Sequence, residues 1–127
     1  MSQPASLSFG VKLLLVFLGG CVGTGLRHAL GMLGGGYASI LVINALGAFL
    51  LGLFTSWVVR FPGPRGGAYR LFIATGMLGS FTTYSAYVVG LGAEEEYAAA
   101  HLIAALALLL IGLLMTALGL RLGRRDD

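Results

Sequence analysis

The sequence predicts an all-α integral membrane protein that crosses the bilayer with four transmembrane helices. Of its 127 residues, 57% are hydrophobic and only 10% are charged, and the mean hydropathy is +0.92. A soluble domain carries about 25% charged residues. The charged residues also divide the chain, since none occurs at residues 28–59, 71–93 or 97–120. Each of these gaps can hold the roughly 20 apolar residues that one membrane-spanning helix needs.

We expect the four helices at about residues 7–27, 37–59, 69–91 and 97–120, in a single membrane domain that covers residues 1–127. Lys12 lies near the start of the first helix, where its long side chain can reach the headgroups. The glycines Gly34–Gly36 mark the first connection, and Pro62 and Pro64 end the second helix. Glu94–Glu96 marks the third connection.

The third helix contains an unusual polar interruption, Gly76-Met-Leu-Gly-Ser-Phe-Thr-Thr-Tyr-Ser-Ala-Tyr87. Glycines and hydroxyl side chains at membrane depth are tolerated where protein buries the freed backbone or where it lines a hydrated path. We therefore expect the third helix to be broken near its middle, close to Gly79. The segment is a candidate ion or substrate site.

Two further features place polar groups inside the spans. Asn44 falls near the middle of the second helix, and it either binds another helix by a hydrogen bond or offers its N–H donors to an anion. Tyr84 and Tyr87 are three residues apart and share a helix face with Thr83. Their hydroxyls and positive ring edges suit an anion path. On spacing alone, however, ordinary packing of the aromatic pair is favoured.

Small residues indicate where helices approach one another. Gly19 and Gly23 form a GxxxG pattern in the first span, and Gly47 and Gly52 lie in the second. These glycines serve either packing within one chain or contacts between subunits. Because four short helices enclose little more than their own side chains, oligomerisation is the economical way to build a transport path.

Several function classes fit the sequence poorly. None of the expected spans contains a carboxylate, which disfavours a small multidrug or quaternary-cation exporter that needs an intramembrane acid. The two histidines, His28 and His101, have no nearby acid in sequence, so we do not expect an enzyme. Cys21 is the only cysteine, so we expect neither an intrachain disulfide nor a cysteine metal site. The net charge of +3 comes without a clustered basic surface and does not indicate nucleic-acid binding. A non-transporting assembly subunit would leave the polar cluster around Asn44 unexplained.

Three segments together resemble the small bacterial fluoride channels, the Fluc or CrcB family. They are Gly19-Gly-Cys-Val-Gly-Thr-Gly-Leu-Arg27, Asn44-Ala-Leu-Gly-Ala-Phe-Leu-Leu-Gly52 and Gly76-Met-Leu-Gly-Ser-Phe-Thr-Thr-Tyr-Ser85. The resemblance covers nearly the whole chain. It implies an antiparallel, inverted dimer of four-helix subunits in the bacterial plasma (inner) membrane, with two pores that export fluoride passively and thereby give fluoride resistance. It also implies a structural sodium ion at the dimer centre.

The resemblance assigns roles to particular residues. The carbonyls of Gly79 and Thr82 would bind the sodium ion, and Arg27 would draw anions into a vestibule. Asn44 matches the asparagine of the fluoride pore, and Thr83 and Ser85 would add hydroxyls to the path.

The chain also departs from the family at two places. Tyr84 and Tyr87 occupy positions where the family usually has phenylalanines whose ring edges meet fluoride. The fourth helix lacks a serine expected partway along, and Thr116 comes later. These differences leave open a subunit whose own pores conduct poorly.

The positive charges are distributed unevenly between the two sides of the expected topology. The side with both termini holds seven basic residues, whereas the other side holds only Arg27; the seven are Lys12, Arg60, Arg65, Arg70, Arg121, Arg124 and Arg125. Basic residues favour the cytoplasm, so we expect both termini there. This bias favours a heterodimer with an oppositely oriented homologue. In such a heterodimer this chain could be a non-conducting partner subunit. A homodimer with dual topology remains the alternative.

Overall fold

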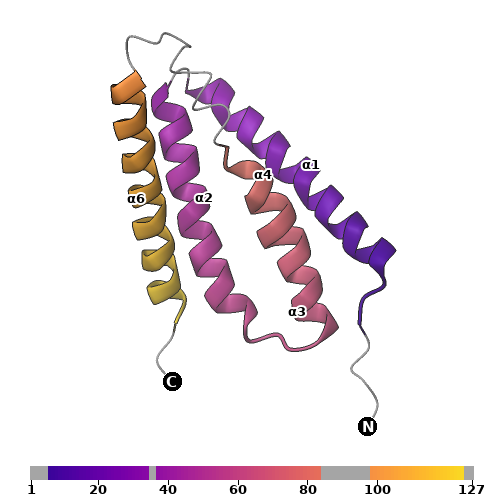
Figure 1. The fold of residues 1–127 in the computed structure, drawn as a ribbon. Helices are drawn as coiled ribbons and strands as arrows, with labels where there is room; N and C mark the ends of the chain where they lie inside the picture. The colour runs from indigo at the N-terminus through magenta and orange to yellow at the C-terminus, as the bar shows by residue number, and fades with distance from the viewer. Residues whose placement is uncertain (1–5, 35–36, 84–97, 125–127) are drawn as a thin grey trace.

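The computed structural model describes residues 6–34, 37–83 and 98–124. Tyr84, Ser85 and Tyr87, which the sequence placed in the pore, lie outside these described residues. The elements run in the order α1 (Phe9–Leu33), α2 (Tyr37–Val58), α3 (Pro64–Tyr69), η1 (Arg70–Leu78), α4 (Gly79–Phe81) and α6 (Ala98–Gly123). The described residues are therefore all helical or connecting, as the sequence predicts, and α1 begins at the same end of the bundle at which α6 ends (Figure 1).

Among the residues that the structure describes, three helices are long and apolar enough to cross a membrane. They cover Phe9–Leu33, Ala38–Val58 and Leu102–Gly123. The remaining helix of the bundle is the broken one formed by α3, η1 and α4, which follow one another without interruption from Pro64 to Phe81. The η1 segment is a π-helix, a form that usually appears only in short stretches.

Two helix ends differ from the expected positions. The first helix continues past Arg27 to Leu33 and ends at Gly34, because nothing between these residues breaks a helix. The third helix begins at Pro64, which supplies a preset φ at its first position after Gly63, whose φ of 77° favours glycine. Its break lies at Thr82 rather than at Gly79, which is still helical.

Close helix contacts at glycines hold α1 against η1 and α4. A Cβ atom added at Gly76 would lie 2.6 Å from the carbonyl oxygen of Val16 and 2.9 Å from the Cα atom of Gly19. A Cβ atom at Gly23 would overlap the carbonyl oxygen of Met77. The GxxxG pattern of the first span therefore serves packing within the chain, one of the two roles the sequence allowed.

The helices α2 and α6 form a second close pair. A Cβ atom at Gly52 would overlap the Thr116 carbonyl oxygen, and one at Gly119 would lie 2.7 Å from the Leu53 backbone nitrogen. The Ser56 hydroxyl donates to the Leu120 carbonyl oxygen at 2.9 Å. The fold is thus two tightly packed helix pairs, α1 with the third helix and α2 with α6 (Figure 1).

Candidate functional site

Asn44 links α2 to the backbone just beyond the broken third helix. Its Nδ2 group donates to the Thr83 carbonyl oxygen at 2.8 Å, and its Oδ1 atom accepts from the Thr83 N–H, also at 2.8 Å. The side-chain amide thus supplies partners to a stretch of backbone that has left the helix. The Nδ2 group carries two hydrogens, and the bond to Thr83 uses one of them.

The helix ends at Thr82 for a local and a tertiary reason. The backbone of Thr82 is extended (φ −78°, ψ 148°), and its N–H and its Oγ1 hydroxyl both donate to the Leu78 carbonyl oxygen at 3.3 Å. A Cβ atom at Gly47 would overlap the Thr82 methyl group and lie 3.0 Å from the ring of Phe81. Gly47 and Asn44 are three residues apart on one face of α2. Gly47 therefore lets the helix end approach, and Asn44 binds the next residue of the chain.

The break changes the hydrogen bonding of the last helical carbonyls. In an α-helix the Thr83 N–H would bond the Gly79 carbonyl. Here that N–H is bonded to Asn44, so this α-helical bond is not made. Carbonyl oxygens at a helix C-terminus carry partial negative charge, and hard cations prefer oxygen ligands. The backbone oxygens of Gly79 and Thr82 therefore have the chemistry that a sodium site requires.

Arg27 extends from α1 to the same helix end. Its Nη1 group donates to the Ser80 carbonyl oxygen at 3.1 Å, and the side chain is half-buried. The single hydrogen of the Ser80 hydroxyl is shared between two acceptors, the Gly20 carbonyl oxygen at 3.0 Å and the Met77 carbonyl oxygen at 3.2 Å. These contacts fix a positive charge beside the break in the third helix, and one bond occupies only one of the five guanidinium N–H groups.

Two pockets meet at Thr83. The first has a volume of about 460 Å³ and opens on the Arg27 side; it is lined by Thr24, Arg27, His28, Gly31, Met32, Ser39, Ile40, Ile43 and Thr83. The second has a volume of about 390 Å³ and is lined by Asn44, Gly79, Thr82, Thr83, Ala105, Leu108 and Leu109. A basic pocket therefore adjoins a pocket that contains the Asn44 amide and the end of the third helix. The guanidinium and the amide N–H are groups that can bind an anion.

The structure brings together the sequence-predicted residues that it describes. Arg27, Asn44, Gly79, Thr82 and Thr83 all lie around the end of the third helix. Sequence reasoning did not single out the Ser80 carbonyl as the partner of Arg27, because backbone contacts between distant segments leave no local pattern.

His28 was also not assigned to the site. It lines the pocket beside Arg27, and its position directly after that arginine was the available signal.

The fourth helix contributes an apolar wall to the site. Ala105, Leu108 and Leu109 line the pocket beside Asn44. Thr116, the hydroxyl residue noted farther along, instead donates to the Ala48 carbonyl oxygen at 3.2 Å. Its observed role is to join α6 to α2.

Comparison with known proteins identifies a family for this arrangement. The family model described as "CrcB-like protein, Camphor Resistance (CrcB)" matches residues 14–120. The chain is 42% identical over 121 residues to the "Fluoride-specific ion channel FluC" of Thermus thermophilus, covering 88% of this chain and 93% of the relative. It is 39% identical over 119 residues to the protein of the same name from Mesorhizobium japonicum, covering 80% and 93%. It is also 40% identical over 131 residues to "Fluoride-specific ion channel FluC 2" of Leifsonia xyli, covering 91% and 88%.

Proposed function

The chain belongs to the CrcB-like family, and we propose that it is a subunit of a fluoride-selective channel that exports fluoride passively across the bacterial plasma membrane. The observation that carries the proposal is the bond between Asn44 and Thr83, which holds a break in a membrane-spanning helix beside two adjoining pockets. Within the hydrocarbon region of a membrane, non-helical backbone is expected where protein buries it or where it lines a water-filled path. The relatives are channels by name, which agrees with the expectation that this chain is not an enzyme.

Passage of fluoride requires groups that replace its water without holding the ion tightly. The Arg27 guanidinium raises the local anion concentration in the first pocket. The second Nδ2 hydrogen of Asn44 is a donor at the next step, in the pocket that also contains Thr83. We assign Ser85, Tyr84 and Tyr87 to the continuation of the path, on the resemblance alone.

A structural sodium ion would be held by the carbonyls of Gly79 and Thr82. Support comes from the diverted Thr83 N–H, which leaves the Gly79 carbonyl without its α-helical donor, and from the extended backbone of Thr82. When bound, the ion supplies positive charge that offsets the partial negative charge of this helix end.

The proposed assembly is an antiparallel dimer. One subunit leaves the pockets open at its surface, and α1 and α6 present many exposed apolar side chains. At the end of the bundle where α1 begins and α6 ends, Lys12 and Arg70 line one pocket, and Arg60 reaches the carbonyl of Gly123. Arg27 lies at the other end. This asymmetry supports cytoplasmic termini and a heterodimer with an oppositely oriented homologue over a homodimer.

The test is ion release from liposomes that contain the purified chain alone, with chloride release as the control. We expect fluoride release with retention of chloride, either from the chain alone or after addition of an oppositely oriented homologue. Release from the chain alone would contradict the heterodimer hypothesis. Absence of fluoride release under both conditions would contradict the channel function.

A further inference from the structure

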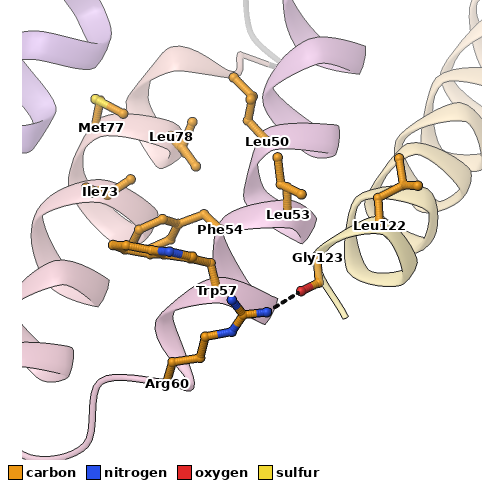
Figure 2. Close-up of a pocket in the computed structure, with 10 residues that line it drawn as sticks. All are labelled: Leu50, Leu53, Phe54, Trp57, Arg60, Ile73, Met77, Leu78, Leu122 and Gly123. Carbon is orange, nitrogen blue, oxygen red and sulfur yellow. Dashed lines mark hydrogen bonds between the residues drawn. The ribbon is translucent and has the colours of Figure 1, made fainter. Parts of the chain in front are cut away.

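A second feature, which borders the Asn44 site at Met77 and Leu78, is an apolar groove between α2, η1 and the end of α6. It has a volume of about 580 Å³. Its lining consists of Leu50, Leu53, Phe54, Trp57, Arg60, Ile73, Met77, Leu78, Leu122 and Gly123 (Figure 2). We call it the α2–η1 groove and propose that it binds one anionic phospholipid.

The length of the groove matches one leaflet of a bilayer. From Leu50 to the end of α2 at Val58 the wall of the groove spans eight residues of sequence, and Arg60 follows in the turn. At a rise of 1.5 Å per residue the helical part is about 12 Å long, close to half of the roughly 30 Å hydrocarbon core. The groove therefore suits an acyl chain that lies alongside α2. Ile73, Met77 and Leu78 of η1 form its other wall (Figure 2).

Aromatic residues mark the level of the membrane surface at one end of the groove. The ring of Trp57 lies 4.6 Å from that of Phe61 and 5.9 Å from that of Tyr69, measured between ring centroids. Tryptophan and tyrosine are enriched where hydrocarbon meets the headgroups. The Trp57 end of the groove is therefore expected at headgroup level, and the Leu50 end within the hydrocarbon.

Arg60 supplies a cation at that headgroup level. Its Nη2 group donates to the Gly123 carbonyl oxygen at 3.3 Å, which directs the guanidinium across the mouth of the groove (Figure 2). The side chain is exposed, and its planar group has further N–H donors suited to a phosphate. No carboxylate lies within residues 6–34, 37–83 and 98–124, so none of the residues that the structure describes pairs with it. An apolar groove that ends in a fixed guanidinium is complementary to an anionic lipid rather than to a neutral apolar surface.

Trp57 makes the proposal directly measurable, because it is the only tryptophan of the chain and lines the groove. The full chain is reconstituted in vesicles that contain either phosphatidylglycerol or phosphatidylcholine with brominated acyl chains, at equal mole fraction. Bromine atoms quench tryptophan fluorescence at close range. We expect phosphatidylglycerol to be preferred at Trp57 by about fivefold, the ratio expected for one basic residue at an anionic surface.

Two variants separate the groove from general attraction to the surface. Arg60→Gln is expected to bring the preference close to one. Arg65→Gln removes an exposed arginine of α3, five residues along the chain, that does not line the groove, and it is expected to keep the preference. Equal quenching by the two lipids in the unmodified protein would overturn the proposal, as would a preference that survives Arg60→Gln. Weak quenching by both lipids would also overturn it, because protein, such as a second copy, would then cover the groove.

Discussion

Replacing Asn44 by leucine tests the central contact of the site. Leucine has nearly the same shape but removes both hydrogen bonds to Thr83. Each such bond contributes about 0.5–1.5 kcal/mol net, and membrane proteins give about 0.6 kcal/mol on average. Because Asn44 is half-buried and faces a pocket, water can replace part of the loss. We therefore expect the free energy of unfolding to fall by about 1–2 kcal/mol.

The same substitution should reduce fluoride release more strongly than it reduces stability. It removes a donor from the anion path, and a hydrogen bond to a charged group is worth about 1.5–3 kcal/mol. This corresponds to a fluoride release rate about 10–100-fold slower. The assays are fluoride release from liposomes and the thermal unfolding midpoint in detergent. Thr55→Val is the matched control on α2, because the exposed Thr55 hydroxyl bonds only the Leu51 carbonyl of its own helix.

A second substitution separates the two roles of Asn44. Asn44→Asp keeps an oxygen that can accept from the Thr83 N–H but places a negative charge in the anion path. Fluoride release should then fall at least as far as in Asn44→Leu. Unchanged release in both variants would refute the pore role, and an unchanged unfolding midpoint in Asn44→Leu would refute the structural one.

Three further predictions concern helix packing and the vestibule. Gly23→Ala should lower the free energy of unfolding by about 1–3 kcal/mol, because its Cβ atom overlaps the third helix. Gly25→Ala has open space around it and should raise this free energy by about 0.4–1 kcal/mol. Thermal unfolding compares the two variants, and equal midpoints would contradict the close approach of the helices at Gly23. Arg27→Gln should slow fluoride release several-fold at low ionic strength and less at high salt, whereas Arg27→Lys should keep most of the release rate. A loss of rate that does not depend on salt would argue against electrostatic attraction of fluoride by Arg27. Thr116→Val should cost about 0.6 kcal/mol of stability without changing fluoride release, and a loss of release would place Thr116 in the path.

Much of the fold follows from the sequence because hydrophobicity and charge act locally. The charge-free segments predicted the membrane-spanning helices, and the glycines and hydroxyls of the third span predicted its break. The exact residue at which the third helix breaks could not be predicted from the sequence. Gly79 stays helical, and the chain leaves the helix at Thr82, where Asn44 provides hydrogen bonds from another helix. A contact between residues 39 positions apart leaves no local pattern that would fix the exact residue.

The π-helix η1 and the pairing of helices were also beyond local reasoning. Hydrophobic residues cover all sides of α6, so its pattern does not tell which face meets α2. Glycines gave the strongest available signal, but a GxxxG pattern has the same form within a chain and between chains. Only the structure identifies η1 and α4 as the partners of Gly19 and Gly23.

The arrangement of these close contacts explains why the polar groups lie where they do. Glycines draw α1 to the third helix and α2 to α6, and the pockets lie between the two pairs. The seam between the two pairs is less closely packed than either pair, apart from the approach at Gly47, so a directional polar contact helps to fix its geometry. The bonds between Asn44 and Thr83 cross this seam. The groups that hold the two pairs in register are therefore the same groups that face the pocket, which couples the alignment of the helices to the path of the ion.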